Sequence, residues 1–214
     1  GVVNTAVGNG ALFYNETGNY NTAIGGSAMG GASGNSHQNN TAVGYKSLFG
    51  VTTGNDNSAL GYNSLYSTTT ARYQVAIGAQ ALYSNTAGDN GVAIGRQALY
   101  NLDQTTNTHV VAVGNAAGYS MTSGKYNSIL GSAAGYFNQT GDYNTAMGYA
   151  AGYGVTGKST DNITAIGARA LQNIVGNDST AVGYQSGYYA SGSQNTFVGS
   201  DAGKGGTTSA PFSS

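Results

Sequence analysis

A five-residue phrase, Asn-Thr-Ala-Val-Gly, recurs with small variations along the whole chain, and each copy ends on a glycine. Successive closing glycines are 16 to 19 residues apart. A period of this length is typical of repeat architectures, in which each repeat buries apolar surface only against its neighbours. The chain is therefore predicted to form a stack of about twelve coils. The closing glycines, predicted to be structural, are Gly8, Gly25, Gly44, Gly61, Gly78, Gly95, Gly114, Gly131, Gly148, Gly167, Gly183 and Gly199.

The residues before each closing glycine predict a short β-strand. Counting from that glycine as position 0, position −1 is always aliphatic, and position −2 is alanine except at Ile129 and Phe197. Position −3 is threonine, serine or valine, and the β-branched threonine and valine favour strands. Successive side chains of a strand point to opposite faces. We therefore expect the aliphatic residue to fill the coil interior and the alanine face to allow close packing.

The rest of each repeat predicts a second short strand and a turn. Position +3 is alanine or serine, and the segment there reads Ala-Leu-Tyr or Ala-Gly-Tyr. A stretch rich in Gly, Asn, Asp and Thr follows, which is typical of turns. No long 3.6-residue apolar periodicity indicates a helix. The fold class is thus all-β, a parallel β-roll or β-solenoid, with loops at the two-residue insertions in residues 36–38, 105–107 and 159–161.

Composition excludes several classes of protein. The chain has 36 Gly but a single Pro, so a collagen repeat is excluded. No apolar run approaches the ~18 residues that a membrane-spanning helix needs, so no membrane insertion is expected. Charged residues are 7% of the chain and the net charge is −1, which gives no electrostatic footprint for nucleic acid. The absence of Cys excludes disulfides and thiolate metal sites.

One coil of this kind has too few large apolar side chains for a core of its own. We therefore expect chains to associate laterally and to share a core built from the alanine-rich and glycine-rich faces. Closed cyclic symmetry is the common arrangement for identical chains. The period alone leaves dimer and trimer open.

The repeat Asn-[Thr/Ser]-Ala-[Val/Ile]-Gly-x-x-Ala-Leu-Tyr resembles the head repeats of trimeric autotransporter adhesins, and still more the longer repeats of bacteriophage tail fibres. The resemblance covers Asn4 to about Lys204. It implies a left-handed, homotrimeric β-roll that extends and presents host-receptor binding. Its partners would be other copies of the chain, other fibre or virion proteins, and a host receptor such as a polysaccharide. A virion is the expected location, and a bacterial cell-surface adhesin is the alternative. Residues 1–204 would form the repeat domain and residues 205–214 a linker or tail.

Three patterns resemble chemical sites, and the repeat phase explains each of them. Residues 152–159 match the phosphate-loop pattern G-x-x-x-x-G-K-[S/T], but that chemistry needs a following helix, and none is expected here. Gly-Asn-Asp at residues 54–56 and 176–178 suggests a calcium β-roll, yet most turns lack Asp. His37 and His109 are 72 residues apart, so only copies of His37 around a symmetry axis could meet. We expect no enzyme activity, no cofactor and no metal.

One row of aromatic residues is the best candidate for surface contacts. Position +5 carries tyrosine in six successive repeats: Tyr66, Tyr83, Tyr100, Tyr119, Tyr136 and Tyr153. If outward, the row could bind sugars; the favoured interpretation is that the rings pack between chains or coils. An ice-binding solenoid is a minor alternative that would use Thr5, Thr22 and Thr41, although valine interrupts that column later.

Overall fold

The computed structural model describes residues 1–31, 33–104 and 108–205. Twelve parallel strands of three residues each form a β-solenoid of about eleven turns, which confirms the predicted all-β fold. No helix occurs within the described ranges. The strands are β1 (Thr5–Val7), β2 (Thr22–Ile24), β3 (Thr41–Val43), β4 (Ser58–Leu60), β5 (Val75–Ile77), β6 (Val92–Ile94), β7 (Val111–Val113), β8 (Ser128–Leu130), β9 (Thr145–Met147), β10 (Thr164–Ile166), β11 (Thr180–Val182) and β12 (Thr196–Val198).

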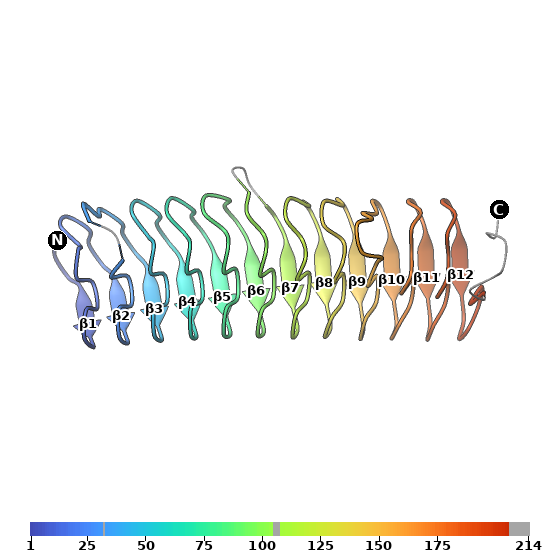
Figure 1. Cartoon of the computed structure of the whole chain (residues 1–214), viewed down its shortest axis with the longest axis horizontal. Helices are drawn as coiled ribbons and strands as arrows, with labels where there is room; N and C mark the ends of the chain where they lie inside the picture. The colour runs from blue at the N-terminus through green and yellow to red at the C-terminus, as the bar shows by residue number, and fades with distance from the viewer. Residues whose placement is uncertain (32, 105–107, 206–214) are drawn as a thin grey trace. The chain divides into compact units, whose positions relative to one another are not determined.

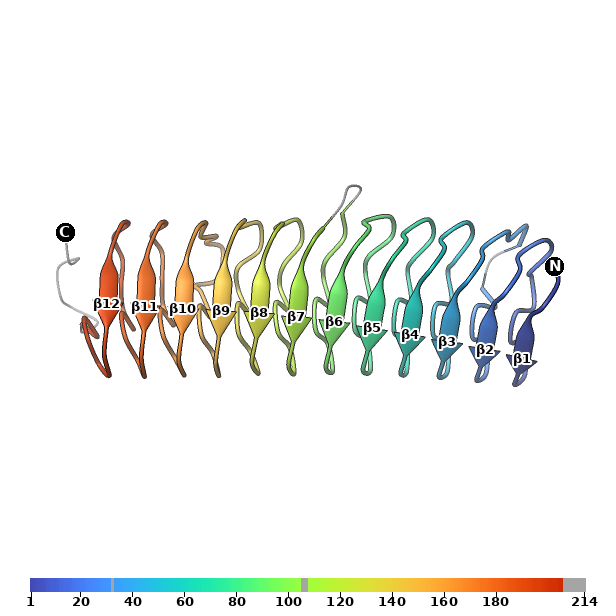
Figure 2. The ribbon, with the colours of Figure 1, turned by 180° about the vertical axis from the view of Figure 1, so that it is seen from behind.

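The chain divides into two compact units, Gly1–His109 with β1 to β6 and Val110–Ser214 with β7 to β12. Within each unit the strands lie side by side in chain order (Figures 1 and 2). Their register places equivalent positions over one another, as in the pairing of Ala76 with Ala59 and Ala93. Of the predicted tail, residues 205–214, all but Gly205 lies outside the described residues.

The closing glycines adopt a backbone conformation that other residues rarely reach. Their φ angles lie between +121° and +139°. A Cβ on Gly61 would come 2.7 Å from the carbonyl oxygen of Gly78, one coil further on. Stacking at the strand spacing of ~4.8 Å therefore leaves no room for a side chain where the chain turns out of the strand.

Gly61→Ala is expected to lower the free energy of unfolding by about 2 to 3 kcal/mol, because it adds a backbone clash to an unfavourable φ. Gly34→Ala is the matched control, since Gly34 has a φ of +75° and nothing within 4 Å of its Cβ position. The control should cost about 1 kcal/mol, the strain alone. Chemical denaturation of both variants measures the difference, and equal losses would contradict the close approach.

The two faces of the strands are the reverse of the predicted assignment. Alanine at position −2 is buried in the coil interior in β2 to β7 and β9 to β11, and Ile129 takes its place in β8. The aliphatic residue at −1 points outward: Leu60 is 49% exposed and Ile77 38% exposed. The alanines therefore pack within one chain, and cannot form the predicted shared core between chains.

A ladder of asparagine side chains at position −4 lies inside the first unit. The Asn40 Nδ2 donates to the Gly54 carbonyl at 2.9 Å and to the Asn21 Oδ1 at 3.3 Å. The backbone N–H and the Nδ2 of Asn57 both donate to the Asn40 Oδ1 at 3.0 Å. The oxygen of each amide thus accepts hydrogen bonds from both the backbone and the side chain of the equivalent residue in the next coil. These bonds satisfy buried polar groups that would otherwise destabilise the fold.

In the first unit the asparagine ladder ends at Gln74 and Gly91, which occupy position −4 in the two coils after Asn57. The Gln74 backbone N–H donates to the Asn57 Oδ1 at 3.0 Å, and its Nε2 donates to the Gly88 carbonyl. Its buried Oε1 has no hydrogen-bond partner, so the ladder goes no further. The next position is Gly91, where a Cβ would lie 2.6 Å from the Gln74 Oε1. The longer glutamine side chain therefore occupies space that the glycine leaves free.

The second segment of each repeat is a series of tight turns, so the predicted second strand is wrong. Its residues at positions +2 and +4 have positive φ in every coil, as at Lys46 (50°) and Leu48 (52°). Leu48 is fully buried. The left-handed backbone turns this bulky side chain into the coil, and interior packing offsets a strain of about 1 kcal/mol or more.

In the second unit, large residues of the same coil or of the next coil occupy the space beside glycines at position +4. A Cβ on Gly135 would lie 3.1 Å from the Ile129 Cδ1, and one on Gly152 3.1 Å from the Ile163 Cδ1. Phe197 occupies the alanine position of the last strand, and its ring lies where Gly187 would carry a Cβ, at 2.7 Å. Interior volume is thus shared between adjacent coils rather than fixed in each repeat.

The inserted residues leave the strand register unchanged. In the coil that joins β9 to β10, residues 156–158 are exposed, slightly before the predicted loop at 159–161. In the coil that joins β2 to β3, His37 is buried between exposed Ser36 and Gln38. The third predicted loop, residues 105–107, lies outside the described residues.

Candidate interaction surfaces

The strand face, defined here as positions −3 and −1 of every strand, is the most regular surface of each unit. Nine of its twelve aliphatic residues at −1 are exposed, from Val182 at 36% to Val198 at 71%, and the other three are half-buried. Position −3 adds threonine, serine or valine, and none of these is buried. No position of the strand face carries a charge. A solvated sheet would normally present polar residues here, so the surface is unusually apolar.

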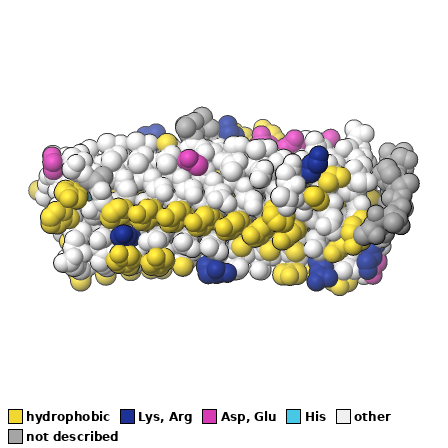
Figure 3. All heavy atoms as spheres, viewed as in Figure 1, with side chains coloured by type: hydrophobic (Ala, Val, Ile, Leu, Met, Phe, Trp, Pro, Cys, Tyr) yellow, Lys and Arg dark blue, Asp and Glu magenta, His cyan; other side chains and the backbone are white. Residues whose placement is uncertain are grey.

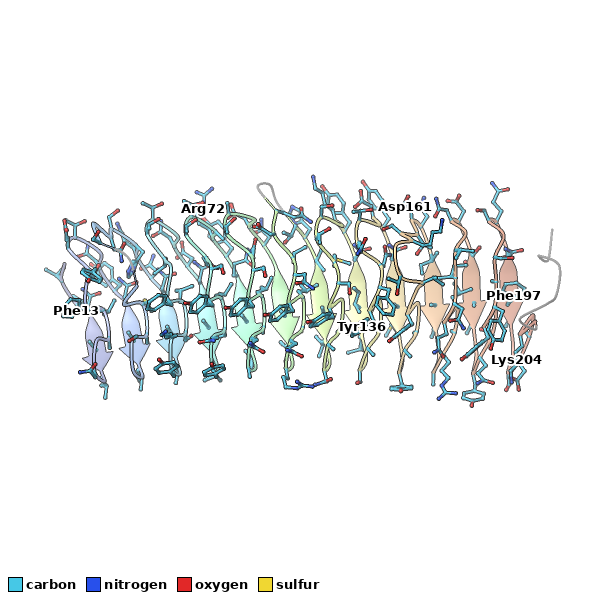
Figure 4. The ribbon with its side chains drawn as sticks, viewed as in Figure 1. Phe13, Arg72, Tyr136, Asp161, Phe197 and Lys204 are labelled. Atoms are coloured by element: carbon cyan, nitrogen blue, oxygen red, sulfur yellow. The ribbon has the colours of Figure 1, made fainter. Side chains whose placement is uncertain are left out.

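The rings of the predicted tyrosine row stack on one another within each unit. In the first unit, ring centroids of Phe49, Tyr66, Tyr83 and Tyr100 follow one another at 5.3, 5.1 and 5.0 Å. In the second unit, Tyr119, Tyr136 and Tyr153 are 5.1 and 5.2 Å apart. All six tyrosines are half-buried. Figure 4 shows Tyr136 within its row of rings.

Stacking limits what the ladders can bind. Tyr66, Tyr83 and Tyr136 each have a ring on both faces, so solvent meets mainly their edges and hydroxyls. A sugar that stacks on an aromatic residue needs an open ring face. Burial, and then the neighbouring phenols of Tyr136 and Tyr149, raise the pKa of Tyr153 above its ordinary value. The geometry therefore suits packing along the coil better than sugar stacking.

Further tyrosines flank the strand face and are more exposed. Those at position +1 include Tyr62 and Tyr149, which are 52% and 55% exposed. Those at position −5 include Tyr126 and Tyr143, whose rings stack at 5.1 Å. In Figure 3 hydrophobic side chains run in rows along the coils and charged ones are scattered singly. Apolar surface thus lies beside the strand face as well as on it.

The phosphate-loop match in residues 152–159 forms turns. Gly152 is buried in the coil, and the Lys158 N–H donates to the Val155 carbonyl at 2.9 Å. No helix begins after it in the described part of the chain. Since phosphate binding by this motif depends on a helix N-terminus, the segment lacks the geometry for that chemistry.

The acidic residues of the two calcium-like turns have partners from neighbouring coils. Asp56 accepts a hydrogen bond from the Asn39 Nδ2 at 3.0 Å, and Asp178 accepts one from the Asn162 Nδ2 at 3.0 Å. Among the described residues, no group of three or more His, Asp or Glu side chains is placed to hold a metal ion. These turns are therefore held by amide–carboxylate pairs.

His37 lies inside the first unit, where it cannot meet copies of itself around a symmetry axis. It is 0% exposed, as is Asn35 two residues earlier. Neither imidazole nitrogen of His37 has a hydrogen-bond partner. Burial lowers the pKa of His37 to about 4, because removal from water disfavours the charged imidazolium.

Acidification from pH 6.5 to pH 4 is expected to destabilise the first unit by up to about 3 kcal/mol through His37. The unfolded chain takes up this proton near pH 6.5, whereas the folded chain resists it until about pH 4. Stability from this group is therefore constant above pH 6.5 and falls below it. Urea denaturation at several pH values, compared with His37→Leu, checks the result. Parallel curves for the two proteins would contradict it.

No family model, no curated protein and no solved structure matches this chain. In the described ranges, no helix is long and apolar enough to cross a bilayer.

The sequence indicated the tyrosine row but missed two features of the surface and core. The asparagine at −4 was visible as the first letter of the recurring phrase, and its persistence beside alanine could have indicated an inward amide ladder. The outward direction of position −1 had no such signal. Alternation defines two faces of a strand but does not say which of them is inside.

Proposed function

We propose that this chain is a structural module of a fibre. Copies of the chain associate laterally, and the fibre positions a receptor-binding region at a distance from the surface to which it is attached. The β-solenoid is the observation that supports this function. Every coil pairs only with its neighbours, so the number of repeats sets the extent of the array. Such a structural role needs no catalytic site. The proposal includes no enzymatic step and no cofactor.

The form of fibre that we propose is a bacteriophage tail fibre, located in the virion, with a bacterial cell-surface adhesin as the alternative. The support is the resemblance of the repeated phrase to the repeats of those two families. The proposed partners are other virion proteins and a host receptor such as a polysaccharide. Phage structural genes beside the coding sequence would favour the first form, and a membrane anchor encoded downstream would favour the second.

A homotrimer is the proposed assembly, and its mass in solution tests the function. Light scattering should give about 65 kDa, three times the chain mass of 21.5 kDa, at micromolar concentration. Association is expected because an isolated chain exposes a regular apolar surface. A monomer of 21.5 kDa at every concentration would contradict the proposal.

Ice binding is less well supported by the outward columns of the strand face. Position −3 is threonine or serine in some coils and valine in β5, β6 and β7, and position −1 is aliphatic throughout. The face thus lacks the two continuous threonine columns that this function would use. We expect no thermal hysteresis from the purified chain.

A further inference from the structure

The twelve repeats of this chain allow outward positions to be compared with one another. The outward position +1 varies freely between Asn, Gly, Tyr, Ala, Arg and Ser. Position −1 also points outward, yet it is Val, Ile, Leu or Met in all twelve coils. Packing inside one chain does not explain this restriction, because nine of these side chains are exposed. Something outside the single chain is needed to account for it.

The properties of the strand face define what could cover it. It carries no charge, so it does not select a charged partner such as nucleic acid. Its aliphatic side chains repeat at the strand spacing of ~4.8 Å, one for each coil. A partner must therefore bring an uncharged apolar surface with the same spacing. Another copy of this chain carries that surface.

The size of the face is sufficient for such a contact. A strand of three residues at ~3.3 Å each and a spacing of ~4.8 Å cover about 50 Å² for each coil. Six strands give about 300 Å² in each unit. Three copies of one unit would then bury about 900 Å² of strand face, close to the ~1,000 Å² that a specific interface needs, before the other unit is counted. The tyrosines at +1, such as Tyr62 and Tyr149, would add to it.

We infer that the strand face is the surface through which the three copies of the proposed homotrimer pack against one another, with the aliphatic residues at position −1 in the contact. This inference rests on the proposed function and specifies its interface. It replaces the alanine face, which is buried inside each chain, with the aliphatic face. The threonine and serine hydroxyls at −3 lie beside the contact and can hydrogen-bond across it.

Cysteine cross-linking tests the inference directly, because the chain contains no Cys. Ile77→Cys places one thiol on the strand face, and Thr70→Cys places one on an exposed turn of the adjacent coil. A short bis-maleimide should join copies of the Ile77→Cys protein and leave Thr70→Cys copies separate. Cross-linking at Thr70→Cys alone, in a protein that is still multimeric, would overturn the interface and leave the proposed function intact. A monomeric wild type would overturn both.

A charged strand face gives a second, independent measurement. The triple variant Leu60→Glu, Ile77→Glu, Ile94→Glu should raise the dissociation constant of the multimer by about 100-fold or more, because it removes apolar contacts and adds repulsion. The control Thr53→Glu, Thr70→Glu, Ala87→Glu stacks the same charges in an equivalent column of turns. It should leave the mass in solution unchanged.

Neutral variants keep this test valid if stacked charges disturb the fold. Leu60→Ser, Ile77→Ser and Ile94→Ser together remove the apolar contact without repulsion, and circular dichroism monitors the strands. An unchanged mass for these folded variants would overturn the inference.

Discussion

Ala76→Asp is expected to unfold the unit Gly1–His109, whereas Ile77→Asp is expected to leave it folded. Ala76 is 0% exposed and lies between the alanines of the adjacent strands, so the new carboxylate would be buried without a partner. Such burial costs about 5 kcal/mol or more, which is comparable to the whole stability of a domain. Ile77 is one residue away on the outward face, where water solvates the charge.

This pair of variants tests the direction of both strand faces with a single substitution type. Circular dichroism and thermal melting at low protein concentration separate loss of the fold from loss of association. The opposite ranking, with Ile77→Asp unfolded and Ala76→Asp folded, would mean that the aliphatic residue fills the interior after all.

Asn40→Leu is expected to lower the free energy of unfolding of the same unit by about 4 kcal/mol. Leucine has a similar size, but it cannot replace the amide, so the Gly54 carbonyl and the Asn57 N–H lose their buried partners. Each orphaned group costs about 1 to 3 kcal/mol. Guanidinium denaturation measures the change, and Asn9→Leu is the control because Asn9 is exposed. A loss no larger than that of the control would show that the amide ladder contributes little.

The sequence predicted the repeat, the strands and their parallel order because these depend on the phase of the pattern. Each predicted strand, such as Thr22–Ile24, occupies positions −3 to −1, and the closing glycine follows at a φ that excludes other residues. Register needed no further information, because equivalent positions of successive coils stack on one another. Periodicity alone determines such features.

The direction of the faces could not be predicted from hydrophobicity, because the size of the side chain decides it. The large side chains of the interior come from the leucine positions at +4, such as Leu48, while the strand contributes alanine at −2 and amides at −4 that bond along the stack. The left-handed turn at Leu48 was equally hidden, since a bulky residue with positive φ contradicts local preference. Only the packing of neighbouring coils stabilises it. The tyrosine row was visible as a pattern, but its stacking follows from the backbone positions.

Coils of 16, 17 and 19 residues all return to the same strand register. The difference is absorbed in turns, as at the exposed residues 156–158, while the alanine and asparagine positions stay in line. The number of residues in one coil can therefore change without altering its neighbours. A segment grafted into such a turn would be presented at the surface without disturbing the coils on either side. The array is in that sense a scaffold whose display loops can diversify independently of its core.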